Sequence, residues 1–394
     1  MRVLTILAAA ALTSGMPAPR SAAVPDIAVV RLPDGAVQPE TVVDARGIVH
    51  LVYLAGEARA ANVFYTRSVD GGRTFTKAAR VNSQDGSAIA TGTVRGAQIA
   101  LSPGGRVHVV WNGSETSTPK PPINPTTGRA GSPLLYARSN AAATAFEPQR
   151  NLITQTTNLD GGASVAATAG GVFVGWHAHP ASGEGTEDAR RVWLAHSSDD
   201  GATFARERAI SDPATGVCGC CGLRMLATPS GELHALYRSA TGGTGRDVYA
   251  LVSRDAAKTF ASRRVHAWQI GACPMTTMSM TATSGRGRLL QAWETDGQVY
   301  FAAAGSSAAP TEPALTAARD VARRKHPRIA VNRDGTVLLV WTEGTAWARG
   351  GSIAWQLFGA DGSPLGGSGS RPSLPVWGFA AAVPRPDGGF TIIY

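Results

Sequence analysis

All sulfur-containing residues after position 23 lie in one stretch of the chain, between residues 218 and 280. The four cysteines form two groups, Cys218-Gly219-Cys220-Cys221 and Cys273-Pro274, and four methionines lie close to them in sequence. Thiolate, thioether and imidazole groups form the soft donor set that Cu(I) prefers, and sets of Cys and His also hold zinc. The sequence therefore predicts a copper or zinc site, with the candidate ligands Cys218, Cys220, Cys221, Cys273, Met275 and His326.

The same cysteines have other interpretations. An exported protein with an even number of cysteines usually oxidises them. One disulfide between the Cys218–Cys221 segment and Cys273 would join two neighbouring parts of the chain, and another pairing would use the adjacent residues Cys220 and Cys221. Free buried thiols are a third state. A metal site, disulfides among the four cysteines and free thiols are therefore all open at this point.

Two histidines and two inserts are further candidates for a site. His177 and His179 follow an apolar segment that ends at Trp176. The inserts 114–132 and 181–190 are rich in Pro, Gly and polar residues. Long inserts between strands often wall a binding pocket, and disorder is the alternative for these two segments.

The elements that position these residues are the copies of a repeat. Seven times the sequence contains a short apolar strand that ends in an aromatic residue, often after a glycine-containing turn. Each copy has further short strands before and after it. The 46 glycines and 24 prolines supply the turns that many short strands require. Four short antiparallel strands per copy predict an all-β fold, a β-propeller. The aromatic residues are Tyr53, Trp111, Trp176, Tyr237, Trp293, Trp341 and Tyr394.

The last copy ends at Tyr394, before its later strands. The segment Asp26 to Leu32 is available to complete this blade, which would remove an exposed sheet edge. We therefore expect seven blades, closed by the N-terminal strand, with six as the alternative. The innermost strands of successive blades begin near the axis of a propeller, so the two cysteine segments and His326 are expected at one funnel.

The first residues have the pattern of an export signal. Arg2 precedes the apolar run Val3 to Leu12, and small residues lead to Ala23. We expect a signal peptide over residues 1–23, cleavage after Ala23, and a single propeller domain over 24–394 in the periplasm or outside the cell.

No later apolar segment is long enough to cross a membrane, and the net charge of +9 comes without any block of Lys and Arg. Membrane insertion and nucleic-acid binding are therefore not expected, and the protein is expected to be a monomer.

The turns after the third strands carry a family resemblance. Ser68 to Phe75 and Ser197 to Phe204 match the pattern Ser-x-Asp-x-Gly-x-Thr-Phe in full, Ser253 to Phe260 matches it with Ala257 in place of the glycine, and Ser139 to Phe146 is a decayed copy. These segments resemble the Asp-boxes of the sialidase (BNR-repeat) superfamily of propellers. In that superfamily the boxes are structural turns on the face away from the site.

The resemblance also implies a chemistry. A working sialidase would hold the substrate carboxylate with three arginines and use a tyrosine nucleophile backed by a glutamate, with an aspartate as acid and base. The family signature Phe-Arg-Ile-Pro is missing, and Gln38-Pro39-Glu40-Thr41 stands at that place, which argues against classical sialidase activity. The residues that fit the types required are Arg224, Arg246, Asp247, Arg328, Glu294 and Tyr237.

Three hypotheses for function follow. The first is a sialidase-like propeller that binds or hydrolyses glycans through its axial funnel, as an exo-sialidase-like glycoside hydrolase if it is active. The second is a propeller that binds a soft metal, copper or zinc, through its Cys, Met and His residues. The third is an interaction scaffold without catalysis, because the fold alone does not determine function.

Overall fold

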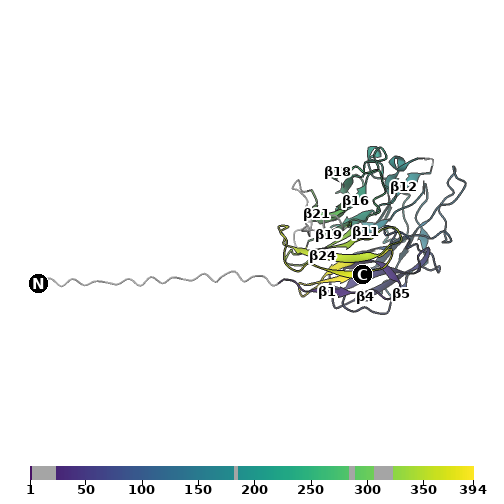
Figure 1. Cartoon of the computed structure of the whole chain (residues 1–394). Helices are drawn as coiled ribbons and strands as arrows, with labels where there is room; N and C mark the ends of the chain where they lie inside the picture. The colour runs from purple at the N-terminus through teal and green to yellow at the C-terminus, as the bar shows by residue number, and fades with distance from the viewer. Residues whose placement is uncertain (2–23, 182–184, 284–288, 306–322) are drawn as a thin grey trace.

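The computed structural model describes residue 1 and residues 24–181, 185–283, 289–305 and 323–394. The predicted signal peptide and its cleavage position lie almost entirely outside these residues. Within them the chain forms seven small β-sheets, and the helical residues are confined to two short 3-10 helices, η1 (Glu187–Ala189) and η2 (Pro213–Thr215) (Figure 1). The predicted all-β propeller with seven blades is confirmed.

The first three blades are formed by consecutive segments of the chain. Blade 1 contains β2 (Ala36–Val43), β3 (Val49–Glu57), β4 (Ala60–Ser68) and β5 (Ala79–Arg80). Blade 2 contains β6 (Gln98–Leu101), β7 (Val107–Asn112), β8 (Leu134–Arg138) and β9 (Arg150–Asn151). Blade 3 contains β11 (Ser164–Thr168), β12 (Gly171–Pro180), β13 (Arg191–Ser197) and β14 (Arg208–Ala209), and β10 (Thr156–Thr157) pairs with the end of β12.

The next three blades continue the same order. Blade 4 contains β15 (Arg224–Ala227), β16 (Leu233–Arg238), β17 (Val248–Ser253) and β18 (Ala261–His266). Blade 5 contains β19 (Ser279–Ala282), β20 (Leu289–Thr295) and β21 (Gln298–Ala303), and residues 306–322 that follow lie outside the described part of the chain. Blade 6 contains β22 (Arg324–Val331), β23 (Val337–Glu343), β24 (Gly351–Phe358) and β25 (Gly369–Leu374).

Blade 7 joins the two ends of the chain. It contains β26 (Ala381–Pro384), β27 (Phe390–Ile393) and β1 (Ile27–Val30). The backbone N–H of Leu32 donates to the carbonyl of Tyr394 at 2.7 Å, and Figure 1 shows the C-terminus beside β1. The N-terminal strand therefore closes the ring as predicted. It pairs in parallel with β27, in contrast to the fully antiparallel blade that was expected.

The core lies between neighbouring blades. The aromatic side chains of the repeat pack there, and Trp111, Trp176, Tyr237 and Trp293 are almost fully buried. The innermost strands contact one another in the order β2, β6, β11, β15, β19, β22, β26 and back to β2. This closed ring of strands surrounds the axis, so residues near the start of each inner strand are brought together at one end.

The turns with the Ser-x-Asp pattern lie at the opposite end, where each third strand finishes. One oxygen of Asp70 accepts the backbone N–H groups of Arg73 at 3.0 Å and Thr74 at 2.9 Å, and the other accepts the Thr74 hydroxyl at 2.6 Å. Asp199 makes the equivalent bonds to Thr203. These bonds satisfy the turn and account for its residue types without a ligand. No helix among the described residues has the length and apolar character needed to span a membrane.

Candidate functional site

The inner strands surround an axial cavity of about 370 Å³. Small and apolar residues line most of this cavity, and three charged side chains lie on its wall, Glu40 of β2, Arg224 of β15 and Arg328 of β22. These residues come from blades 1, 4 and 6, so the ring of strands brings together side chains that are far apart in sequence. Two of the arginines proposed to hold a substrate carboxylate are thus at the axis.

Both of these arginines already hold a carboxylate of the protein. The Glu40 oxygens lie 2.7 Å from a guanidinium nitrogen of Arg224 and 3.1 Å from one of Arg328, and Gln98 donates to Glu40 at 3.3 Å. Burial raises the pKa of Glu40, but the cations of Arg224 and Arg328 outweigh this effect and keep the pKa below its ordinary value. Glu40 belongs to the segment in which the sialidase signature has an arginine. Glu40 therefore occupies both arginines, which are not free to clamp a substrate carboxylate while this ion pair is intact.

The remaining glycosidase candidates have separate partners. Arg246 forms an ion pair with Glu187 at 2.5 Å, and Asp247 accepts the backbone N–H of Trp268 at 2.8 Å. The hydroxyl of Tyr237 lies 2.9 Å from that of Thr215. The Glu294 carboxylate accepts the backbone N–H of Gly297 at 2.8 Å and lies 3.9 Å from Arg238. These contacts give each side chain a structural role, and they do not join Tyr237 to Glu294 as a nucleophile and its supporting carboxylate.

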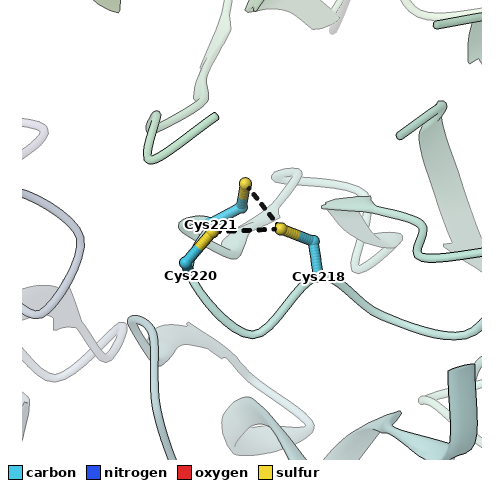
Figure 2. A group of neighbouring side chains, drawn as sticks. All are labelled: Cys218, Cys220 and Cys221. Carbon is cyan, nitrogen blue, oxygen red and sulfur yellow. Dashed lines mark hydrogen bonds between the residues drawn. The ribbon is translucent and has the colours of Figure 1, made fainter. Parts of the chain in front are cut away.

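The first cysteine segment forms a compact loop between η2 and β15. The backbone N–H of Cys218 donates to the carbonyl of Arg238 at 2.9 Å, which fixes the start of the loop on blade 4. The loop then turns so that the Cys218 sulfur lies 3.4 Å from that of Cys220 and 3.0 Å from that of Cys221 (Figure 2). Cys218 and Cys221 are buried and Cys220 is partly buried. The three sulfur atoms could therefore contact one ion.

The second cysteine segment joins the same cluster from blade 5. The exposed Cys273 precedes β19, and its sulfur, that of Cys220 and a carboxylate oxygen of Glu187 all lie within 4.8 Å of one another. The structure thus brings all four predicted cysteines together. Met275 and His326 line a neighbouring cavity of about 40 Å³, together with Trp347 and Trp377, and His326 belongs to neither of the two potential metal-binding groups among the described residues.

None of the four cysteines is in a disulfide in this structure. The sulfur separations of 3.0 and 3.4 Å in the loop are well beyond the ~2.05 Å of an S–S bond. The disulfides proposed from the sequence therefore stay a prediction, and so does the metal site among the same cysteines.

The electrostatic environment favours a thiolate at Cys221. Burial raises its pKa, but hydrogen bonds from the thiols of Cys218 and Cys220, the Arg238 cation and the backbone of Thr276 bring it well below the ordinary value. Hydrogen bonding with Cys218 and Cys221, together with burial, raises the pKa of Cys220. Among the three cysteines, these shifts favour deprotonation at Cys221, and binding of a metal would release the protons of the thiols that bind it.

His177, a candidate from the sequence, holds this loop in place together with Gly161 and Glu187, which were not among the candidates. His177 donates from Nε2 to the Cys221 carbonyl at 2.8 Å, so this histidine supports the loop through its backbone. Gly161 donates its N–H to the Gly219 carbonyl at 2.7 Å, and a Cβ at Gly161 would lie only 2.5 Å from that oxygen. Glu187 accepts the N–H of Gly219 at 2.8 Å. In the sequence, Glu187 was marked only by its place in the insert 181–190, which was considered as the wall of a pocket.

His179 has a different role. It donates from Nε2 to the carbonyl of Thr186 at 3.0 Å and lies 3.3 Å from the Asn158 amide. These contacts connect the end of β12 to the described part of the insert. His179 therefore supports the segment that carries Glu187.

Comparison with known proteins identifies relatives of the fold. No protein-family model matches the chain, and no curated protein matches it in sequence. Among solved structures, the α-L-arabinanase of Penicillium chrysogenum in complex with arabinobiose has a TM-score of 0.54 at 12% identity over 83% of this chain and 94% of its own. The intramolecular trans-sialidase of Ruminococcus gnavus has a TM-score of 0.51 at 11% identity over 84% and 95%.

A third structure is the Hadza microbial sialidase Hz136, with a TM-score of 0.50 at 15% identity over 82% of this chain. The match spans 65% of the length of that sialidase. At these identities the comparisons establish the fold, which is a sialidase-like β-propeller, as the resemblance implied. A shared fold alone does not show that this chain has the functions of these proteins.

Proposed function

We propose that this protein binds a soft metal ion, Cu(I) or Zn(II), at the end of the propeller where the inner strands begin. The observation that carries the proposal is the convergence of Cys218, Cys220 and Cys221 in one partly buried loop, with separations of 3.0 and 3.4 Å from the Cys218 sulfur. A metal–sulfur distance of about 2.3 Å is compatible with such spacing after small side-chain movements. Sulfur ligands alone favour Cu(I) over harder cations.

The surroundings compensate the charge of such a site. Three thiolates with one Cu(I) ion carry a net negative charge, which is costly to bury without cations nearby. Arg238 is close enough to lower the pKa of Cys221. Burial lowers the pKa of Arg190, and the nearby Asp160, Glu187, Cys218 and Cys220 oppose this shift without reversing it. Both guanidinium groups therefore lie where they can offset the negative charge of a metal-loaded loop. The residues of the loop bind and shield the ion, and no step of substrate chemistry is needed for this function.

The test is elemental analysis of purified full-length protein, paired with titration of its thiols under denaturing conditions. We expect copper or zinc near stoichiometric amounts and titratable thiols after the metal is removed. Cys218→Ser and Cys221→Ser should each lose metal. Met280→Leu is the matched control, because it removes a buried sulfur of blade 5 outside the cysteine cluster with little change in volume. Absence of metal after anaerobic loading, or four cysteines fully oxidised in the native protein, would overturn the proposal.

A second candidate function is glycan binding at the same end of the propeller. Trp347 is 58% exposed, and its ring lies 4.6 Å from that of Trp377 at an angle of 70°. Both rings border the 40 Å³ cavity, together with the polar side chains of Lys325 and Arg349. Exposed aromatic rings beside polar groups suit the apolar face and hydroxyl groups of a sugar. The structural likeness to sialidases and an arabinanase supports this candidate as well.

The glycan hypothesis is tested by binding to a glycan array and by hydrolysis of sialosides. Trp347→Ala should abolish array binding, whereas Cys221→Ser should leave it intact. Equal binding by Trp347→Ala and the wild type would count against this site. If neither metal nor glycan binds, an interaction scaffold is the remaining hypothesis.

A further inference from the structure

The cysteine cluster has an outer part that faces solvent. Glu187, Cys220 and Cys273 have ligand atoms within 4.8 Å of one another, as do Cys218, Cys220 and Cys221. Cys220 is the one residue common to the two groups. The two groups together form a continuous line of donor atoms from an exposed residue to a buried one.

Resting on the proposed function, we infer that the cluster provides two metal positions that share the Cys220 sulfur. The inner position is formed by Cys218, Cys220 and Cys221, and the outer position by Glu187, Cys220 and Cys273. The outer position receives the ion from solvent or from a donor with thiol or thioether ligands. The ion then moves to the inner position by exchange of ligands at Cys220.

The solvent exposure of the ligand residues decreases from the outer position to the inner one. Cys273 is exposed, Cys220 and Glu187 are partly buried, and Cys218 and Cys221 are buried. An ion bound at the outer position is therefore accessible to an incoming donor, whereas an ion at the inner position is shielded from competing ligands. The shared sulfur keeps the ion bonded to the protein during the transfer.

The donor types differ in the same direction. The outer position has two sulfur ligands and one carboxylate oxygen, and the inner position has three sulfur ligands. A soft ion such as Cu(I) binds sulfur more strongly than carboxylate oxygen, so the inner position is favoured at equilibrium. The outer position is correspondingly the weaker and more exchangeable one.

Glu187 is held firmly in the place this role requires. One of its oxygens accepts the N–H of Gly219 at 2.8 Å and the other accepts from Arg246 at 2.5 Å. Each carboxylate oxygen has more than one acceptor position, so these bonds leave a lone pair for a metal. Arg246, considered above as a glycosidase residue, becomes a positioning residue for the outer carboxylate.

Transfer of the ion between the two positions needs no oxidant or reductant. The bonds from the metal to the Cys273 sulfur and the Glu187 oxygen break, and bonds to the Cys218 and Cys221 sulfurs form. The oxidation state of the metal does not change. Thiol protons displaced from the cysteines pass to water, and Cys273 takes up a proton when its bond to the metal breaks.

The test is anaerobic titration of the reduced full-length protein with Cu(I) in the presence of a chromophoric Cu(I) chelator. We expect the wild type to bind two ions, one strongly and one weakly. Cys273→Ser should bind only the strong ion, with unchanged affinity, and should load about tenfold or more slowly, a loss in the range known for perturbed metal sites. Cys218→Ser should lose the strong ion and retain the weak one.

Glu187→Gln separates the role of the carboxylate charge from the shape of the side chain. The amide oxygen can still accept the Gly219 N–H, so the loop is expected to keep its fold, while the weak ion binds less well. Met280→Leu should titrate like the wild type, and circular dichroism checks that each variant is folded. If a cysteine variant proves unfolded, the titration of Glu187→Gln tests the inference in its place, because this variant keeps all four thiols.

The outcomes distinguish this inference from the proposed function. A wild-type protein that binds one ion, with Cys273→Ser unchanged in stoichiometry and loading rate, would overturn the two-position arrangement and leave the metal-binding proposal intact. A wild-type protein that binds no ion would overturn both. Simultaneous loss of both ions in Cys273→Ser would also contradict the inference, because the inner position should not depend on Cys273.

Discussion

The Glu40 carboxylate lies 2.7 Å from the Arg224 guanidinium at the axis of the propeller, and it also contacts Arg328 at 3.1 Å. A protein carboxylate thus occupies the position between two arginines that a sialidase-like chemistry would assign to its substrate. Glu40 and Arg328 are almost fully buried, at 4% and 5% exposed, and Arg224 is partly buried. This internal ion pair explains how the chain can keep two axial arginines and lack the rest of the signature.

Replacing Glu40 should therefore create both instability and an anion site. In Glu40→Ala the buried Arg328 and the partly buried Arg224 lose their counter-ion, so we expect the free energy of unfolding to fall by about 3–5 kcal/mol. Acetate should bind between the arginines and restore part of the thermal stability. The measurement is a thermal unfolding series with increasing acetate at constant ionic strength. An equal effect of acetate on the wild type and on Glu40→Ala would show that no such site forms.

Gly161 is expected to be essential for the geometry of the cysteine loop. A Cβ at this position would lie 2.5 Å from the Gly219 carbonyl oxygen and 2.6 Å from that of Cys221. Gly161→Ala should displace the loop, weaken binding of the inner metal about tenfold or more, and reduce stability by about 1–3 kcal/mol. Gly104→Ala is the matched control, because a Cβ there meets no atom within 4 Å. Wild-type Cu(I) affinity in Gly161→Ala would contradict the supporting role of the close contact.

The sequence was sufficient to predict the blades and the meeting of the cysteines, because both follow from the repeat. The aromatic residues define the copies, and the copies place Cys221 and Cys273 at the starts of neighbouring inner strands. The pairing of Glu40 with Arg224 and Arg328 was not predictable in this way, since it depends on the relative heights of strands in blades 1, 4 and 6. Contacts between side chains across the axis leave no periodic pattern in the sequence from which they could be predicted.

Two predicted metal ligands line a separate cavity for a local reason. Met275 and His326 have positive φ angles of 51° and 52°, in the left-handed region that residues other than glycine rarely adopt. The backbone at these positions therefore directs each side chain differently from a regular strand, and both border the cavity beside Trp347. The bulge between Lys325 and Arg328 accompanies this change in β22. Nothing in the residue types of this segment specifies that backbone conformation.

His108 should make the stability of blade 2 depend on pH. Burial lowers its pKa to about 4, although the nearby Asp200 carboxylate raises it. The Nδ1 atom lies 2.7 Å from the Tyr136 hydroxyl, and the side chain is fully buried. Because the unfolded histidine has a pKa near 6.5, the unfolded state binds a proton between about pH 6.5 and 4 that the folded state does not.

The contribution of His108 is therefore fully present above about pH 6.5 and is lost as the pH falls toward 4. The loss amounts to about 3 kcal/mol across this window. His108→Gln should remove it, so the difference in unfolding free energy between wild type and variant should shrink as the pH is lowered. The measurement is urea unfolding at several pH values from 7 to 4. A difference that is constant with pH would show that His108 does not titrate in this way.

If the cysteine loop binds a metal as proposed, removal of that metal should lower the thermal stability of the protein through the two blades that supply the cysteines. A ligand that binds only the folded state stabilises it by about 4 kcal/mol when its free concentration is a thousand times the dissociation constant. Reduced protein loaded with Cu(I) should therefore unfold at a higher temperature than the same protein treated with a Cu(I) chelator. Cys221→Ser should show no such difference, because it lacks a ligand of the inner position, whereas Cys273→Ser should retain most of it. A chelator effect of equal size in the wild type and in Cys221→Ser would place the stabilising metal somewhere other than this loop.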